Sequence, residues 1–102
     1  MTRSALLIVY DTRSGKETAR VPACGDGADL FFDQARDQRY LVCGDGHVDV
    51  LRWEGRELTR VERVPTGAGA RTGLFVPSLS MLFVAVPARS GSMAEIRAYG
   101  IR

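Results

Sequence analysis

The sequence predicts an all-β fold made of short antiparallel strands, and three observations lead to this prediction. Short apolar runs alternate with turn segments rich in Gly, Asp and Ser along the whole chain. No stretch of about ten residues shows the 3.6-residue apolar period of an amphipathic helix. One strand–loop pattern occurs twice, and corresponding residues such as Val21 and Val64 lie 43 positions apart. A repeat of about this length built from short strands is typical of a β-propeller blade.

Each copy of the repeat starts with the tripeptide Arg-Val-Pro, at Arg20 in the first copy and at Arg63 in the second. A glycine-rich loop follows in both copies, and two apolar strands come after it. The chain of 102 residues holds little more than two such units, whereas a closed propeller needs at least about four blades. The sequence therefore predicts β-propeller blades of four-stranded antiparallel sheets that form an incomplete ring in one chain.

The N-terminal segment predicts a hairpin. Residues 5–10 are apolar, with β-branched and aromatic members, and residues 18–21 form the return strand. Between them, residues 11–16 combine Asp and Ser, whose side chains bond nearby backbone, with Gly15, which can supply a positive φ.

Four strands are expected in the middle of the chain, at residues 28–33, 39–43, 48–51 and 58–64. The second of these is almost continuously apolar, as in a strand that is buried on both faces. The fourth does not follow a clean period of two, which suits an outer, half-solvated strand.

Three further strands are expected at residues 72–76, 81–86 and 95–99, where they repeat the first three strands of the central unit. Labelled a to d from the axis outward, the strands divide the chain into residues 1–21 (strands c and d), 28–64 (one whole blade) and 72–102 (strands a to c). A single blade cannot bury both of its apolar faces, so neighbouring blades must cover them.

This division leaves both outer units of a lone chain open, and the last sheet ends in an unpaired edge that invites another chain. An exposed apolar patch is expected on the last unit, with contributions from Leu74, Phe75, Leu82, Phe83 and Val84. We therefore expect copies of the chain to close a propeller ring as a homo-oligomer, with swapped strands at the seams.

Composition excludes several partners. The chain has 14 basic and 12 acidic residues and a net charge of +2, a balance that argues against nucleic acid and anionic membranes. No apolar run approaches the roughly 20 residues that span a bilayer. The apolar run at residues 5–10 is too short for a signal-peptide core, so no export signal is expected in the chain as given.

The two cysteines do not make a metal site by their spacing. Cys24 and Cys43 are 19 residues apart and His47 is the only histidine, which falls short of a zinc ligand set. Both cysteines fall at the same end of adjacent expected strands, so a disulfide is possible. Free buried thiols are the favoured interpretation, because cysteine is among the most buried residue types.

Several segments resemble YVTN-repeat β-propellers. Residues 9–16 (Val-Tyr-Asp-Thr-Arg-Ser-Gly-Lys) are similar to the turn that joins the outer strands of such blades. Residues 29–33, 39–42 and 46–50 resemble the blade that follows, and residues 96–99 resemble a closing C-terminal strand. The resemblance covers nearly the whole chain but only about two of the usual seven blades. It implies surface-layer-like binding proteins, lactonase-like propellers and quinoprotein or haem propellers as relatives.

Polar residues in the loops expected at one end of the blades are the candidate ligand-binding residues. They are Asp26, Asp29, Asp45, His47, Arg71 and Arg89. Carboxylates and guanidinium groups around a central channel would suit a polar ligand, and His47 would suit a haem, a metal or a general base. The alternative is that Asp and Arg beside glycine form turns and cap strand ends, and that His47 is a solvated turn residue. This alternative is favoured for all six.

No catalytic constellation is complete in the sequence, and no catalytic residue, metal site or cofactor is expected. The glycine-rich loops precede no helix, so they lack the dipole of a phosphate-binding loop. The sequence predicts a self-assembling structural or binding scaffold without enzymatic activity. The alternative is a remnant of a lactonase-like or cofactor-binding propeller enzyme, whose site would use His47, Asp29 or Arg71.

Overall fold

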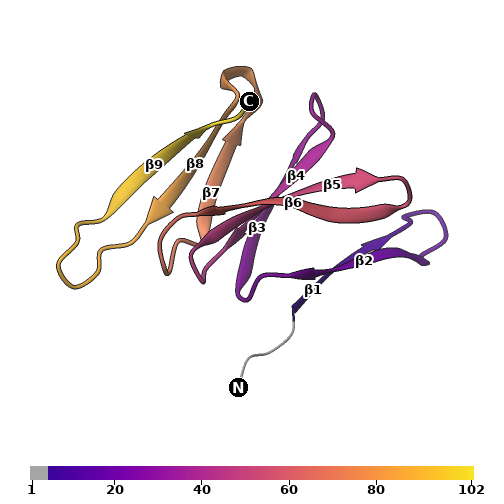
Figure 1. Ribbon diagram of the computed structural model, residues 1–102, viewed down its shortest axis with the longest axis horizontal. Coiled ribbons are helices and arrows are strands. Elements are labelled where there is room, and N and C mark those ends of the chain that lie inside the picture. Colours follow the sequence, from indigo (N-terminus) through magenta and orange to yellow (C-terminus); the bar gives the residue numbers. More distant parts are fainter. Residues whose placement is uncertain (1–4) are drawn as a thin grey trace.

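The computed structural model describes residues 5–102 as nine strands and one short 3₁₀ turn, which confirms the all-β prediction (Figure 1). The strands are β1 (Ala5–Tyr10), β2 (Glu17–Ala23), β3 (Gly27–Asp33), β4 (Gln38–Cys43), β5 (His47–Glu54), β6 (Glu57–Pro65), β7 (Thr72–Val76), β8 (Met81–Val86) and β9 (Glu95–Gly100). The 3₁₀ turn η1 (Pro77–Leu79) joins β7 to β8. Within residues 5–102 there is no helix of the length and apolar character that crossing a membrane requires.

The strands form three antiparallel sheets, with the orders β1-β2, β3-β4-β5-β6 and β7-β8-β9. We call them the N-terminal hairpin, the central sheet and the C-terminal sheet. Every hydrogen-bonded pair consists of strands that follow each other in the chain, so short turns make all connections within a sheet. The central sheet lies between the other two (Figure 1).

One face of the central sheet packs against the N-terminal hairpin. Side chains that point into this contact include Leu41 and Leu51 from the central sheet and Val21 from β2, all at most 8% exposed. Leu7 and Val9 of β1 complete the cluster. Alternation along β1 sends these two residues inward, while Leu6 and Tyr10 remain exposed on the other face.

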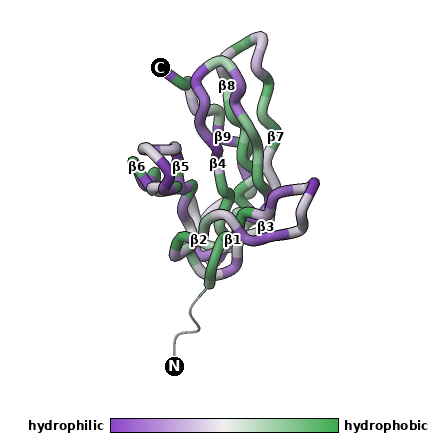
Figure 2. Tube along the Cα trace, turned by 90° about the vertical axis from the view of Figure 1, so that its right-hand side faces the viewer, coloured by the Kyte–Doolittle hydropathy of each residue, from purple (hydrophilic) through white to green (hydrophobic). Residues whose placement is uncertain are grey.

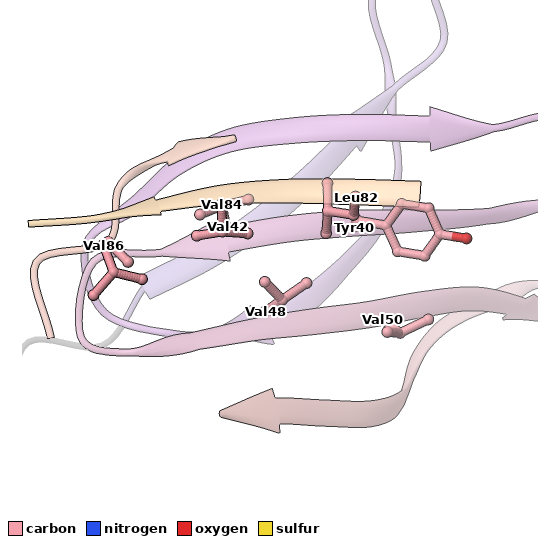
Figure 3. Packing of buried hydrophobic residues seen from close by; sticks show 8 residues of the cluster. Tyr40, Val42, Val48, Val50, Leu82, Val84 and Val86 are labelled. Carbon is pink, nitrogen blue, oxygen red and sulfur yellow. The ribbon is translucent and has the colours of Figure 1, made fainter. Parts of the chain in front are cut away.

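The opposite face of the central sheet packs against the C-terminal sheet. Tyr40 and Val42 of β4 lie beside Leu82 and Val84 of β8 in this second cluster (Figure 3). Each aliphatic side chain buried in this way contributes about 1.5–3 kcal/mol relative to an exposed position. The two clusters together make a three-layer stack of sheets.

Strand β4 is buried on both faces, as its near-continuous apolar sequence predicts. Leu41 and Cys43 point toward the hairpin, and Tyr40 and Val42 point toward the C-terminal sheet. Burial of both side-chain sets requires a neighbouring sheet on each side.

The C-terminal sheet is less exposed than the sequence analysis expects. Leu82 and Val84 are only 3% and 0% exposed, so they do not belong to an exposed patch. The reason is the period of two along β8, which points both residues at the central sheet. Leu74 and Phe83, which are paired on the other face, remain exposed and half-buried respectively. Hydrophobic residues dominate β7 and β8 (Figure 2).

A β-bulge explains the irregular apolar pattern of β6. Val50 is paired with Glu62 and Leu51 with Arg60, so Val61 has no partner on β5. The extra residue shifts the alternation, and therefore Leu58, Val61 and Val64 do not follow a strict period of two. Leu58 faces the hairpin, whereas Val64 packs against the cluster on the other face.

Gly73 allows the C-terminal sheet to approach the central sheet closely. A Cβ atom at this position would lie 3.1 Å from Val42 Cγ2 and 3.2 Å from Phe31 Cε2. The Gly73 backbone also donates a hydrogen bond to Asp29 Oδ2 at 3.0 Å. A side chain at this position would push β7 away from both contacts.

Replacement of Leu51 by alanine should lower the free energy of unfolding by about 2–5 kcal/mol, because it leaves a cavity between the hairpin and the central sheet. Urea denaturation followed by circular dichroism measures this loss. Leu79→Ala is the matched control, since Leu79 is 61% exposed. Equal effects of the two substitutions would contradict the packing described above.

Candidate functional site

Three loops meet at one end of the stack, which we call the loop end. They are residues 24–26, 44–46 and 66–71, and backbone hydrogen bonds join them directly. The Gly44 amide donates to Asp26 O at 2.7 Å, and the Gly69 amide donates to Gly44 O at 2.7 Å. The Thr66 amide donates to Gly46 O at 2.8 Å. Four of the six candidate residues, Asp26, Asp45, His47 and Arg71, lie in or beside these loops.

Asp26 and Arg71 form an ion pair at the loop end, with 2.5 Å between Arg71 Nη2 and Asp26 Oδ2. Both side chains are about half exposed, so the pair contributes at most about 1 kcal/mol. Asp26 has a positive φ of 60°, a conformation that Asp tolerates better than most residues. Gly44 lies under the pair, where a Cβ atom would collide with the Asp26 carboxylate.

Asp45 and His47 form a second polar pair, with 3.1 Å between His47 Nδ1 and Asp45 Oδ1. Both residues are partly exposed, and they are only two positions apart. The contact therefore comes from the β4–β5 turn itself. A solvent-facing turn histidine with one local carboxylate has the geometry expected of a turn residue.

Asp29 and Arg89 do not join these two pairs through hydrogen bonds. The Asp29 carboxylate accepts a hydrogen bond from the Gly73 amide and so connects β3 to β7. Arg89 lies on the β8–β9 loop, where its backbone pairs with that of Ser92. This loop extends from the lower left of the stack in Figure 1. The structure therefore divides the six candidates into one ion pair, one polar turn contact, one strand-to-strand contact and one exposed loop residue.

The preference for free thiols was wrong, because Cys24 and Cys43 form a disulfide. Their Cα atoms are 6.0 Å apart, which is within the usual range for a disulfide. Cys24 follows β2 and Cys43 ends β4, so the bond ties the hairpin to the central sheet. Both cysteines are buried, as expected, but their sulfurs are bonded to each other and are not free thiols.

Asp49 is an acidic residue that lies against the disulfide. The Cys24 and Cys43 sulfurs and an Asp49 oxygen lie within 4.8 Å of one another. The sulfurs are bonded to each other, however, and Arg63 holds the Asp49 carboxylate through two hydrogen bonds of 2.7 and 3.1 Å. Asp49 is 1% exposed, and the hydrogen bond to its carboxylate raises the pKa of Arg63. In this arrangement a half-buried arginine compensates the charge of a buried carboxylate.

A polar network lies at the opposite end of β4 and was not anticipated. Tyr40 donates to Asp33 Oδ2 at 2.6 Å, and Gln38 Nε2 donates to the Tyr40 hydroxyl at 2.7 Å. Arg36 approaches the same carboxylate at 3.1 Å and reaches the backbone of Ile101 and Arg102. Arg36 therefore links the β3–β4 turn to the end of the described chain.

Burial and this network shift two pKa values. Burial and, second, the hydrogen bond to Asp33 raise the pKa of Tyr40 to about 12. Burial alone would raise the pKa of Asp33, but hydrogen bonds from Tyr40 and Arg36 outweigh it, so the pKa of Asp33 is lowered. Tyr40 therefore stays protonated and Asp33 stays charged near neutral pH. This state fixes the hydrogen bonds and provides no proton for transfer at that pH.

A groove of about 730 Å³ opens between the central sheet and the end of the C-terminal sheet. Polar and apolar groups contribute to its walls in about equal parts. The lining includes Val48, Val50, Val61, Val64, Leu82, Tyr99 and Ile101, together with Arg52, Glu62 and Arg102. We call this feature the β9 groove. It borders β9, a strand with one hydrogen-bonded neighbour among the described residues.

No protein-family model matches this chain, and neither a curated protein nor a solved structure reaches a significant match. The resemblance to YVTN-repeat propellers therefore remains a proposal that depends on the residues themselves.

The polar side chains at the loop end bind neighbouring loop residues. Those inside the stack form hydrogen bonds that link one strand to another. Sequence reasoning missed Asp33, Tyr40, Asp49 and Arg63, although one signal was present. Asp49 interrupts an apolar strand between Val48 and Val50, and a charge at such a position needs a buried partner. The partner itself, on the neighbouring strand, can be identified only once the register is known.

Reduction of the disulfide should lower the free energy of unfolding by about 3 kcal/mol, because the bond closes a loop of about 20 residues in the unfolded chain. Urea denaturation with and without dithiothreitol measures this effect. The double variant Cys24→Ser/Cys43→Ser is the control and should not respond to dithiothreitol. An unmodified chain that is equally insensitive would show that the bond is absent or has no stabilising effect.

The raised pKa of Tyr40 predicts a loss of stability at alkaline pH. The unfolded chain ionises this tyrosine near pH 10, whereas the folded chain holds its proton until about pH 12. Stabilisation from the protonated form is thus complete below pH 10 and is lost as the pH rises toward 12. Tyrosinate absorbance should show a step near pH 12 that Tyr40→Phe removes. If the substitution removes only absorbance at lower pH, the buried network is not as described.

Proposed function

We propose that this chain is a β-propeller repeat segment of the YVTN type that acts as a self-assembling structural or binding scaffold and has no catalytic activity of its own. The observation that carries the proposal is the stack of antiparallel sheets, of which the middle one alone is covered on both faces by residues 5–102. Blades of a propeller pack in this way around an axis. The two outer sheets have two and three strands against four in the central sheet.

Exposed apolar side chains on the central sheet and on the C-terminal sheet support assembly. Leu30 and Phe32 on β3 are 49% and 52% exposed, and Leu74 on β7 is 58% exposed. A soluble monomer seldom keeps patches of this kind without a partner. The polar candidates at the loop end, led by the Asp26–Arg71 pair, would repeat around the axis of a ring. Such a repeat would suit a binding role for a small polar ligand.

The absolute mass in solution tests the proposal. One chain has a mass of 11.2 kDa, and light scattering after size exclusion should give a single discrete multimer of about two to four copies. If each copy contributes two sheets to the ring, this range spans the roughly four to eight blades of known propellers. A monomer at all accessible concentrations would contradict the proposal.

Replacement of Phe83 by aspartate should abolish assembly, because Phe83 lies on the open face of the C-terminal sheet beside Leu74. Light scattering should then report a monomer, while circular dichroism should still show folded β structure. Met93→Asp is the matched control, since Met93 is 86% exposed on the β8–β9 loop and should leave the multimer intact. A multimer that survives Phe83→Asp would place the contact elsewhere.

A further inference from the structure

We infer that the open face of the C-terminal sheet in one copy docks head to tail onto the part of the central sheet, over β3, that the hairpin leaves uncovered in a second copy. The inference rests on the proposed function and deepens it, because it names both surfaces of the contact. We call the surface around Leu30 and Phe32 the head. We call the surface around Leu74, Phe83 and Ile96 the tail.

The head is open because the N-terminal hairpin is narrower than the central sheet. Leu30 is paired with Leu41 on the same face of the sheet, and Leu41 is buried against the hairpin. Leu30 and Phe32 nevertheless stay about half exposed. The two strands of the hairpin reach β6, against which β2 lies, but they do not cover β3. The Arg39 guanidinium lies over the Phe32 ring, 4.6 Å from its centroid, so the room for further strands over β3 lies mainly around Leu30.

The tail is the face of the C-terminal sheet that points away from the central sheet. Phe83 is paired with Leu74 on one side and with Ala98 on the other. Ile96 lies two residues from Ala98, so it shares that face, and it is 75% exposed. Apolar side chains from all three strands thus form one surface. The opposite face of the same sheet carries Leu82 and Val84, which are already buried.

Head and tail lie on opposite sides of one stack, so they cannot meet within a single copy. A second copy can join them, and the contact would repeat the sheet-on-sheet packing that the chain already uses twice. Such a contact is heterologous, with different surfaces on the two partners, and it gives closed rings when the rotation permits. This geometry argues for a second copy of this chain as the occupant.

The free strand edges agree with this docking. β1 and β9 each have one hydrogen-bonded neighbour among the described residues. When the tail of one copy covers the head of the next, the hairpin of the second copy comes to lie beside β9 of the first. Its exposed Leu6 and Tyr10 would then face the β9 groove, whose apolar part includes Val61, Val64 and Ile101. Two unpaired edges and one open groove are covered by the same contact.

A mixing experiment tests the inference with three matched substitutions of exposed leucines. Leu30→Asp blocks the head, Leu74→Asp blocks the tail, and Leu79→Asp changes the η1 turn outside both surfaces. Each blocked variant alone should be a monomer in analytical ultracentrifugation, and Leu79→Asp should assemble like the unmodified chain. Circular dichroism checks that all three variants remain folded.

An equal mixture of the two blocked variants should form a dimer, at a total concentration at which each alone is monomeric. The intact tail of Leu30→Asp meets the intact head of Leu74→Asp, and the remaining ends are both blocked, so growth stops at two copies. A mixture that stays monomeric, or a blocked variant that still forms the multimer, would overturn the inference. Failure of the proposed function looks different, because the unmodified chain would then itself be a monomer.

Discussion

The burial of β4 on both faces is the constraint on which the rest of the structure depends. Val42 and Cys43 are neighbours in the chain, point in opposite directions and are both 0% exposed. Water is excluded from both only if a sheet covers each face of the central sheet. The hairpin and the C-terminal sheet supply that cover. Within residues 5–102, neither of them has a sheet on its own far side, so their outer faces are left uncovered in one copy.

Most of the buried polar chemistry strengthens this stack. Arg63 compensates Asp49 in the hairpin interface, and Asp29 holds the Gly73 amide between the central and C-terminal sheets. The disulfide adds a covalent link from the end of β2 to the end of β4. These carboxylates, arginines and cysteines could transfer protons or bind ligands in another setting. Here they are bonded to partners on neighbouring strands and loops. Such a distribution fits a protein whose role is carried by its surfaces.

Strands could be predicted from the sequence because turn residues and apolar runs are local signals. The bulge at Val61 is already visible as a broken period of two in β6. Contacts between distant residues could not be predicted in the same way. Cys24 and Cys43 are compatible with a disulfide or with free thiols by spacing alone, and only the placement of the hairpin against β4 decides between them.

The loop end illustrates the same limit. Asp26 and Arg71 were both candidates, yet their pairing depends on how the β2–β3 and β6–β7 loops cross beside Gly44. The exposure of Leu82 and Val84 was overestimated because composition does not say which face of β8 meets the central sheet. Local sequence thus determines which residues form strands. Which side chains of a strand point toward a neighbouring sheet depends on how the sheets pack.

Amide hydrogen exchange at several protein concentrations separates the covered central strand from the open outer edges. We expect β4 amides to be strongly protected at every concentration, because both faces of the strand are covered within one copy. Amides of β9 and β1 should gain protection as the concentration rises, when a second copy covers their open edges. Protection of β9 and β1 that does not depend on concentration would show that no second copy covers these edges. A β4 that exchanges as fast as the outer strands would show that it is not covered on both faces.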